Sequence, residues 1–345
     1  MFSINNNYLI SNSVDFILIG GAALLTFLII TIFNLNLGLD IVFIMFVLAF
    51  FVNSPHFMIS YQIFYSSGLK KVFNKSSFFF VGFIIPIILI MIISVGMYYQ
   101  NDLPFLFMLV SMFFLVGWHY IKQTYGCFIV YSAGNKIYYS KLEQNLIKFS
   151  LYPLWIFSFL KLFTSDHVQN FWGLEYKFPN FLSDFTTLMG LASIIGFFVF
   201  ILLIMYGYFF KRIKPNLIAL TPMIIIYIWM SPIFWHEIYF YMIPFFHSLQ
   251  YFLFTGAYTK NKIKKESLGT RGWLMWWGGA FVSGAVFFEF LPKYLDSIFY
   301  QGNSITSNLF LISFIFFINI HHYFIDSVIW RGSNLDVREN LKFNS

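Results

Sequence analysis

The sequence predicts an all-α protein, a polytopic transmembrane bundle of about ten helices, from its composition, its apolar runs and the placement of its charges. Of 345 residues, 59% are hydrophobic and 10% are charged, and the mean hydropathy is +0.74. Soluble domains carry roughly a quarter charged residues, far more than the 21 Lys and Arg and 14 Asp and Glu of this chain. We therefore expect one integral membrane domain over 1–345, with short tails at about 1–14 and 331–345.

The apolar runs give the number of spans. A helix needs about 20 apolar residues to cross the hydrocarbon core of a bilayer. Such runs lie at 16–35, 41–66, 77–99, 104–130, 145–163, 187–210, 216–235, 236–258, 272–291 and 306–330. Only a tight turn at Trp235, His236 and Glu237 separates the seventh run from the eighth, and without that turn the count is nine.

The charges between the runs test this count independently. Basic residues follow every second run: Lys70, Lys71 and Lys75; Lys136, Lys141 and Lys148; Lys211, Arg212 and Lys214; Lys260, Lys262, Lys264, Lys265 and Arg271; Arg331, Arg338 and Lys342. The opposite loops are mainly acidic, with Lys177 and Lys293 as exceptions. Because cytoplasmic loops carry the excess of Lys and Arg, both termini are predicted to be cytoplasmic. That alternation requires an even number of spans. We also expect the membrane to be a bacterial plasma membrane.

The remaining composition excludes several classes of protein. The net charge is +7, but the basic residues lie in short loops between apolar runs, so we expect no nucleic-acid partner. Residues 1–13 contain no Lys or Arg and lack the charged region of a secretory signal peptide, so we expect the first run to be retained. Cys127 is the single cysteine, which excludes an internal disulfide and a thiolate metal cluster within one chain.

Six of the seven histidines lie in or at the edge of apolar runs, where ionisable side chains are costly and mark functional sites. Five are inside even-numbered runs, which all cross from outside to inside: His56, His119, His247, His321 and His322. Counted from the outer end of its run, His247 lies about 11 residues in. His56, His119 and His322 lie about 15 or 16 residues from the outer ends of their runs. At about 1.5 Å per residue the spread in depth is about 6 to 8 Å. We therefore expect these histidines to share one site.

The two other histidines are expected elsewhere. His236 stands 11 residues before His247, roughly 16 Å nearer the outer surface along one helix. It and Glu237 are candidates of second rank. His167 lies in the longest external loop, at about 164–186, and is not expected to belong to the site.

Each histidine of the layer has a polar residue three or four positions later, a spacing that places both on one face of a helix. The pairs are His56 with Ser60, His119 with Gln123, His247 with Gln250 and Tyr251, and His322 with Asp326. Asn53 and Asn319 each precede a histidine by three residues. These polar side chains fit two roles, orienting the histidines or joining helices by hydrogen bonds.

The residue types indicate a metal site. Several neutral imidazoles with a carboxylate suit iron, copper or zinc, and a carboxylate in hydrocarbon is too costly without a partner. We predict His56, His119, His247, His321 and His322 as metal ligands, with Asp326 and Gln123 as the catalytic residues. Iron is our choice because a lipid-embedded site with few acid or base groups suits oxygen chemistry better than hydrolysis. Zinc, copper and haem are the alternatives.

The pattern resembles that of polytopic membrane oxygenases that hold non-haem iron with helix-borne histidines, among them the Brp/Blh carotenoid dioxygenases. The helix-borne histidines above carry this resemblance, which is one of type. The chain departs from that family in its larger number of spans and in the histidine context from His321 to Asp326, and no continuous motif matches. The HxxxH and HxxHH boxes of membrane desaturases are absent from the sequence. The resemblance implies an oxidoreductase or oxygenase acting on a lipid or isoprenoid, with an electron donor that the sequence does not identify.

Four other readings remain open. The histidines fit a haem-binding electron-transfer protein, although a lone cysteine excludes covalent c-type attachment. They also fit a transporter or channel with a histidine-lined path, for which His236, Glu237 and Glu289 near the outer side are the supporting residues. An acyltransferase would use one histidine as a general base. Interhelical hydrogen bonding without function is the plainest reading.

Overall fold

The structure is a computed structural model that describes residues 7–33, 39–66, 68–164, 167–178, 183–234, 237–299 and 305–343. Of the described residues, 82% are helical and 3% are in strands, as the all-α prediction requires. Within these described ranges, eight helical segments are long and apolar enough to cross a membrane. The remaining two predicted runs form α10, which has 14 residues, and α11.

The helices follow the predicted runs in order. Their bounds are α1 Asn12–Phe16, η1 Ile17–Gly21 and α2 Ala22–Ile32; α3 Leu39–Tyr65 and α4 Leu69–Asn74; α5 Ser76–Phe79, η2 Phe80–Ile84 and α6 Ile85–Tyr99; α7 Leu103–Gly134; α8 Lys141–Phe163; α9 Ser183–Phe210; α10 Leu217–Met230; α11 Glu237–Lys265; α12 Gly269–Trp273, η3 Leu274–Gly278, α13 Gly279–Ala285, η4 Val286–Phe290 and α14 Leu291–Phe299; α15 Leu309–Ile329; and α16 Leu335–Asn340. Residues labelled η form π-helix, in which each hydrogen bond spans five residues.

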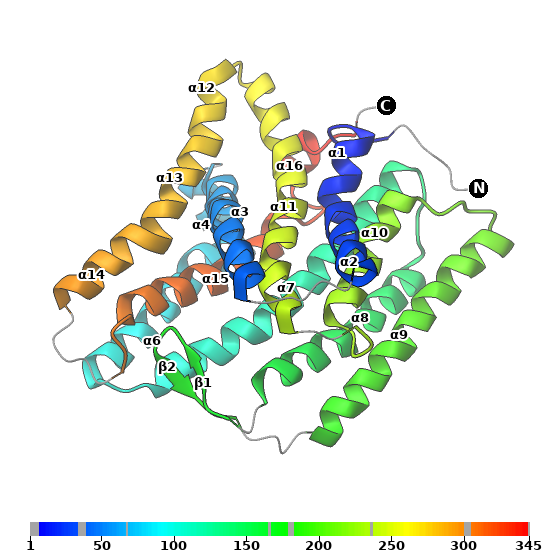
Figure 1. Cartoon of the computed structure of the whole chain (residues 1–345). Helices are drawn as coiled ribbons and strands as arrows, with labels where there is room; N and C mark the ends of the chain where they lie inside the picture. The colour runs from blue at the N-terminus through cyan, green and yellow to red at the C-terminus, as the bar shows by residue number, and fades with distance from the viewer. Residues whose placement is uncertain are drawn as a thin grey trace.

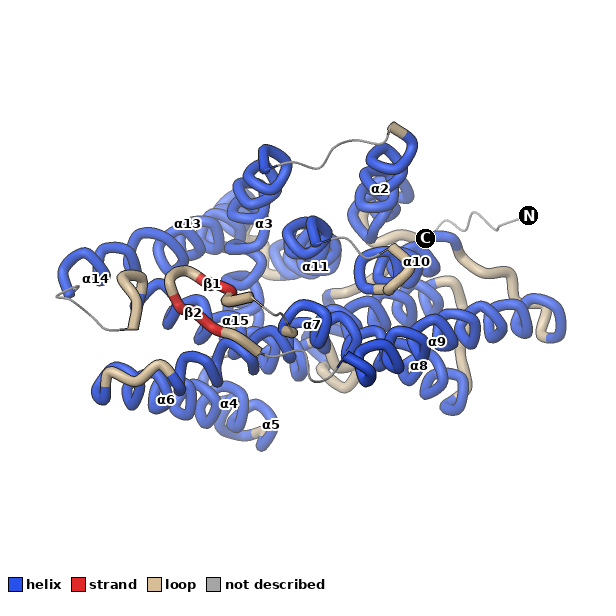
Figure 2. Tube along the Cα trace, turned by 60° about the horizontal axis from the view of Figure 1, so that its bottom comes forward, coloured by secondary structure: helices blue, strands red, loops and turns tan. Residues whose placement is uncertain are grey.

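Four helices make the centre of the molecule: α3, α7, α11 and α15. α11 packs along α3, and α15 packs against both α3 and α7. Viewed as in Figure 2, α11 lies between α3 and α10, with α7 beside it. The helices outside this centre expose many large apolar side chains, as lipid-facing helices do.

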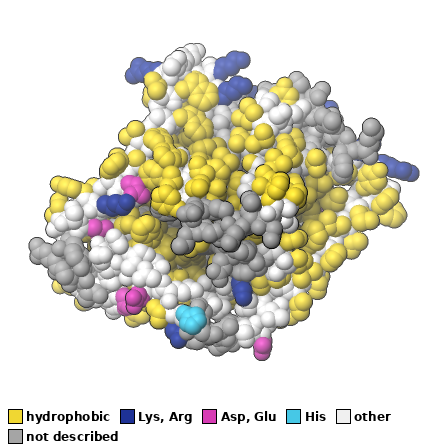
Figure 3. Space-filling model, viewed as in Figure 1, with side chains coloured by type: hydrophobic (Ala, Val, Ile, Leu, Met, Phe, Trp, Pro, Cys, Tyr) yellow, Lys and Arg dark blue, Asp and Glu magenta, His cyan; other side chains and the backbone are white. Residues whose placement is uncertain are grey.

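Both described ends of the chain meet at one end of α7 (Figure 1). Asn7 donates a hydrogen bond to the Gly134 carbonyl, and the Phe343 ring lies 5.4 Å from the Tyr131 ring. The Tyr131 hydroxyl donates to Asp15 at 2.7 Å, which fixes the first helix to the same place. On the face in Figure 3, basic side chains gather at the tips of α11 and α12, and acidic ones lie lower.

The first span is bent at Gly20. Its φ of 152° is a conformation that glycine adopts readily and other residues adopt rarely. A Cβ added at this position would lie 3.1 Å from Thr221 and 3.3 Å from Ile225. The bend leaves the Ile19 carbonyl outside regular α-helix, and Gln250 Nε2 donates to it at 2.7 Å. A side chain of α11 therefore holds the bend of the first span.

The loop between α8 and α9 contains a hairpin that the sequence did not predict. Strand β1, Gln169–Phe171, pairs antiparallel with β2, Leu174–Tyr176, and the turn between them places Trp172 and Gly173 at positive φ. Three-residue strands carry too little alternation to be recognised in sequence. The Thr306 hydroxyl donates to the Trp172 carbonyl at 3.0 Å, so the hairpin is held against the segment that precedes α15.

The start of α15 is capped from α14. Asp296, which is buried, accepts hydrogen bonds from the backbone amides of Phe310 at 2.7 Å and Leu311 at 3.0 Å. These are first-turn amides that have no partner within the helix. The carboxylate therefore fixes the first turn of the helix that carries His322 and Asp326.

Asp296→Ala should lower the free energy of unfolding by about 1 kcal/mol, because a lost helix cap costs about 0.5–2 kcal/mol. Thermal unfolding of purified protein in detergent measures this. Asp102→Ala is the matched control, since Asp102 precedes α7 without making a side-chain cap bond. Equal melting temperatures for the two variants would contradict the capping role.

Candidate metal site

Four of the five predicted histidine ligands converge in the centre of the bundle. They come from four helices, His56 on α3, His119 on α7, His247 on α11 and His322 on α15, and each is at most 4% exposed. The similar depths read from the sequence thus correspond to neighbouring positions in space. Helix packing of α15 against α3 and α7 brings the side chains within reach of one another.

The ring nitrogens of these histidines face one another in two pairs. His56 Nε2 lies 3.1 Å from His322 Nε2, and His119 Nε2 lies 3.1 Å from His247 Nε2. The pairs are adjacent, with 5.0 Å between the ring centroids of His119 and His322. The four rings therefore form one compact cluster with nitrogen atoms at its centre.

The outer nitrogens of His56 and His322 determine which tautomer each ring adopts. His56 Nδ1 lies 2.9 Å from the Asn53 carbonyl, which only accepts, so Nδ1 carries the hydrogen. His322 Nδ1 lies 2.7 Å from Ser60 Oγ, whose own hydrogen goes to the Phe57 carbonyl at 2.6 Å. His322 Nδ1 is therefore also a donor. In both rings Nε2 is left with a lone pair directed at the centre of the cluster.

Asp326 supplies a carboxylate to the same centre. Its Oδ2 lies 3.4 Å from His322 Nε2 and 3.8 Å from His119 Nε2, and its side chain is 7% exposed. Its Oδ1 accepts a hydrogen bond from the Tyr251 hydroxyl at 2.9 Å. One carboxylate oxygen is thus held by a tyrosine while the other faces the histidines.

Two groups of three residues have ligand atoms within 4.8 Å of one another, and His119 belongs to both. They are His56, His119 and His247, and His119, His322 and Asp326. All five residues are buried, and nitrogen with carboxylate oxygen is a donor set that transition metals accept. The buried cluster is therefore able to hold a metal ion.

His321 lies outside the cluster, contrary to the ligand role expected from the sequence. Its Nε2 donates to the Val81 carbonyl at 2.9 Å, and its Nδ1 lies 2.9 Å from the Tyr61 hydroxyl. Val81 belongs to the π-helix η2, so its carbonyl lies outside regular α-helix. Both ring nitrogens are occupied, and His321 joins α15 to α3 and η2.

Gln123 also points to a neighbouring helix rather than into the cluster. Its Nε2 donates to the His247 carbonyl at 3.0 Å and to Gln250 Oε1 at 3.2 Å. It therefore positions the backbone of α11 at His247. A catalytic role for Gln123 has no contact here to support it.

The other polar partners divide between the cluster and the helix contacts. Ser60, expected beside His56 on its own helix, instead contacts His322. Asn53 contacts His56 through its carbonyl and accepts from Ser248 through its side chain at 3.0 Å. Asn319 accepts from Tyr323 at 3.1 Å on its own helix.

The structure does not test the second-rank candidates. His236 lies outside the described residues, and the side chain of Glu237 is not described either. His167 is exposed in the loop between α8 and α9. Cys127 is buried on α7, eight residues after His119, and belongs to neither metal-binding group of the described residues.

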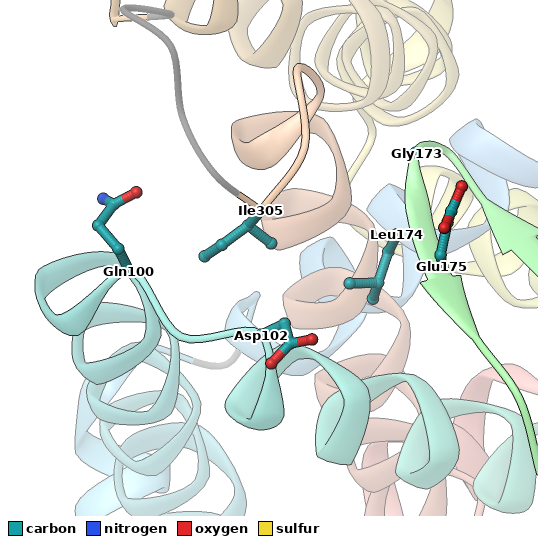
Figure 4. Close-up of a pocket in the computed structure, with 6 residues that line it drawn as sticks. All are labelled: Gln100, Asp102, Gly173, Leu174, Glu175 and Ile305. Atoms are coloured by element: carbon teal, nitrogen blue, oxygen red, sulfur yellow. The ribbon is translucent and has the colours of Figure 1, made fainter.

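A cavity of about 430 Å³ lies between the start of α7, the β1–β2 hairpin and the segment before α15 (Figure 4). Its lining consists of Gln100, Asp102, Gly173, Leu174, Glu175 and Ile305. Asp102 precedes His119 by 17 residues, roughly 26 Å along α7. The cavity is therefore separate from the histidine cluster.

Comparison of the chain with protein-family models, curated proteins and solved structures found no match. The resemblance to carotenoid dioxygenases thus remains a prediction, and function must be argued from the site itself.

The main residue that the sequence reasoning underused is Tyr251. It was noted only as a polar neighbour of His247, but it makes the hydrogen bond to Asp326 and its ring lies 4.8 Å from that of His56. Its position four residues after His247 was the available signal. Ser248 was missed, because adjacent residues on a helix do not ordinarily share a face.

The bond between Tyr61 and His321 should stabilise the fold without belonging to the cluster. We expect Tyr61→Phe and His321→Asn each to lower the free energy of unfolding by about 1 kcal/mol, the usual value of one buried hydrogen bond. In the double variant the losses should add incompletely, because both changes remove the same bond. Chemical unfolding in detergent measures the free energy of unfolding of the two single variants and the double variant. Strict additivity of the losses would refute the coupling between Tyr61 and His321.

Proposed function

We propose that this protein is a metal-dependent membrane oxidoreductase, with iron the preferred metal, whose ligands are His56, His119, His247, His322 and Asp326. One observation carries the proposal. His56 Nε2 and His322 Nε2 face each other at 3.1 Å, while the Nδ1 atoms of both rings donate hydrogen bonds to other groups. Two lone pairs at that distance repel each other. A cation between them turns the repulsion into two bonds.

The spacing suits a single small ion. Nitrogens bound at about 2.1 Å to one ion, with angles of about 90–110° between them, lie about 3.0–3.4 Å apart. A bis-histidine haem would instead separate its axial nitrogens by about 4 Å, with the porphyrin between the rings. The pairs at 3.1 Å therefore favour a bare metal ion over the haem alternative.

The carboxylate supports a cation in the same place. Asp326 is buried with four histidines, and neutral imidazoles do not balance a negative charge. A divalent or trivalent ion supplies the missing positive charge. A proton on His322 would supply it as well, which is the arrangement expected of a proton path, and metal analysis separates the two cases.

Iron and an apolar substrate follow from the surroundings of the cluster. Aromatic rings enclose it: Tyr120 lies 4.5 Å from His247, Tyr323 lies 5.0 Å from His119, and Phe57 lies 4.7 Å from His322. Such walls suit a lipid or isoprenoid better than a charged molecule. Oxidation at iron fits this setting better than hydrolysis, which needs acid and base groups around the metal.

Aromatic rings also connect the cluster to the α12–α14 segment. Phe57 stacks on Phe288 of η4 with 5.3 Å between ring centroids, and Phe57 in turn contacts His322. The segment Gly269–Phe299 has 17% of its span buried, so it faces lipid over most of its surface. Two rings thus separate the cluster from the bilayer, and this supports lateral entry of the substrate.

The proposal includes ten spans in a single domain, with both termini cytoplasmic in a bacterial plasma membrane. The lysine-rich loops and the meeting of both chain ends at Gly134 support this orientation. In this arrangement α15 runs from outside to inside, and Trp330 and Arg331 lie at the cytoplasmic end. An electron donor would therefore approach from the cytoplasm.

Single cysteines should report this orientation, because Cys127 is buried and does not compete for reagent. Tyr138→Cys, in the exposed turn before α8, should react with a membrane-impermeant maleimide only after cells are opened. Lys177→Cys, exposed after β2, should react in intact cells. Labelling of both positions from the same side of the membrane would overturn the proposed topology.

Metal content tests the site directly. Purified wild-type protein should contain bound metal, and His119→Ala and His322→Ala should lose it, because each removes a nitrogen at the centre of the cluster. Inductively coupled plasma mass spectrometry of protein purified in detergent gives the content. Bound metal should also stabilise the fold, by about 2.7 kcal/mol at a hundredfold excess over Kd.

His321→Ala is the matched control, since it removes the neighbouring histidine from the same helix but leaves the cluster intact. It should keep wild-type metal content even though its melting temperature falls. A wild-type protein without metal, or equal metal content in the His119 and His321 variants, would falsify the proposed site.

A further inference from the structure

A chain of hydrogen bonds leads from the cluster toward the end of α15. The Trp330 indole donates from Nε1 to the Tyr251 hydroxyl at 3.3 Å, and that hydroxyl donates to Asp326 Oδ1 at 2.9 Å. Both directions are fixed, because indole nitrogen only donates and a carboxylate only accepts. The Tyr251 hydrogen is therefore directed at a proposed metal ligand.

The rings along this chain are also in close contact. The Tyr251 ring centroid lies 4.8 Å from that of His56, and the Trp330 ring lies 5.6 Å from that of Tyr251. Tyr251 is 3% exposed, whereas Trp330 is partly buried and is followed by the exposed Arg331. Two oxidisable side chains thus connect the buried cluster to the surface.

We propose that Tyr251 and Trp330 form a one-electron relay between the metal site and a donor at the end of α15. This inference rests on the proposed function, since it requires a redox-active metal ion in the cluster. The donor belongs to the class of one-electron reductants, such as a reduced flavin or an iron–sulfur protein.

Once hydrogen peroxide or dioxygen has oxidised the metal ion, the relay transfers one electron to it in three steps. Tyr251 gives one electron to the oxidised metal ion, its O–H bond breaks, and the proton forms an O–H bond with Asp326 Oδ1. Trp330 then gives one electron to the Tyr251 radical, which takes the proton back from Asp326. The external reductant gives one electron to the Trp330 radical cation. In sum, one electron passes from the donor to the metal, and no proton is consumed.

Other buried tyrosines near the cluster are not placed for this role. Tyr323 donates to Asn319 and Tyr61 contacts His321, so neither hydroxyl is directed at Asp326. Tyr120 is partly buried and packs on His247 with 4.5 Å between ring centroids. It serves as a matched control that touches the cluster without bonding to the carboxylate.

The experiment uses full-length protein loaded with iron and treated with hydrogen peroxide, followed by freeze-quenching and electron paramagnetic resonance. Wild-type protein should give a tyrosyl radical signal. Tyr251→Phe should lose the signal, whereas Tyr120→Phe should retain it. Trp330→Phe should form the radical but lose it several-fold more slowly when dithionite is added, because the second step of the relay is missing.

Iron content is measured on every sample, so that failures can be told apart. Iron-loaded wild-type protein without a radical, or a radical unchanged in Tyr251→Phe, overturns the relay and leaves the metal site intact. Equal decay in Trp330→Phe and wild type overturns the step through Trp330. Wild-type protein that binds no iron overturns the proposed function, and the relay with it.

Discussion

The central constraint on this molecule is that polar groups inside a lipid-embedded bundle have no water to satisfy them. Four imidazoles and one carboxylate meet at its centre, and the outer nitrogens of His56 and His322 donate to Asn53 and Ser60. Their inner nitrogens are consequently both acceptors. The proposed metal site follows from the need for positive charge between them.

The same constraint explains the irregular helices around the cluster. Carbonyls at the bend near Gly20 and in η2 accept from side chains of other helices: Ile19 from Gln250, Val81 from His321 and Gly82 from Tyr65. These bonds hold the outer helices to α11, α15 and α3. Side chains beside the histidines thus position the bundle while the histidines themselves face inward.

The sequence predicted the helical runs and the convergence of His56, His119, His247 and His322, because hydropathy and depth along a helix are local properties. The choice between His321 and His322 was also within reach, since Asp326 is four residues after His322 and shares its face. The partners of Ser60, Gln123 and Gln250 were not predictable, because they lie on other helices. Nor was the hairpin at Gln169–Tyr176, whose strands are too short to show a pattern.

In the proposed function, substrate and electrons reach the cluster from different sides. Phe57 and Phe288 lie between His322 and the lipid-facing η4 segment, whereas Tyr251 and Trp330 lead from Asp326 to the end of α15. A substrate in the bilayer therefore need not displace the electron donor, and the donor need not enter the membrane. The separation is possible because several helices contribute to the buried site. α15 supplies the ligands His322 and Asp326, while α3 and α11 supply the contacts on the two sides.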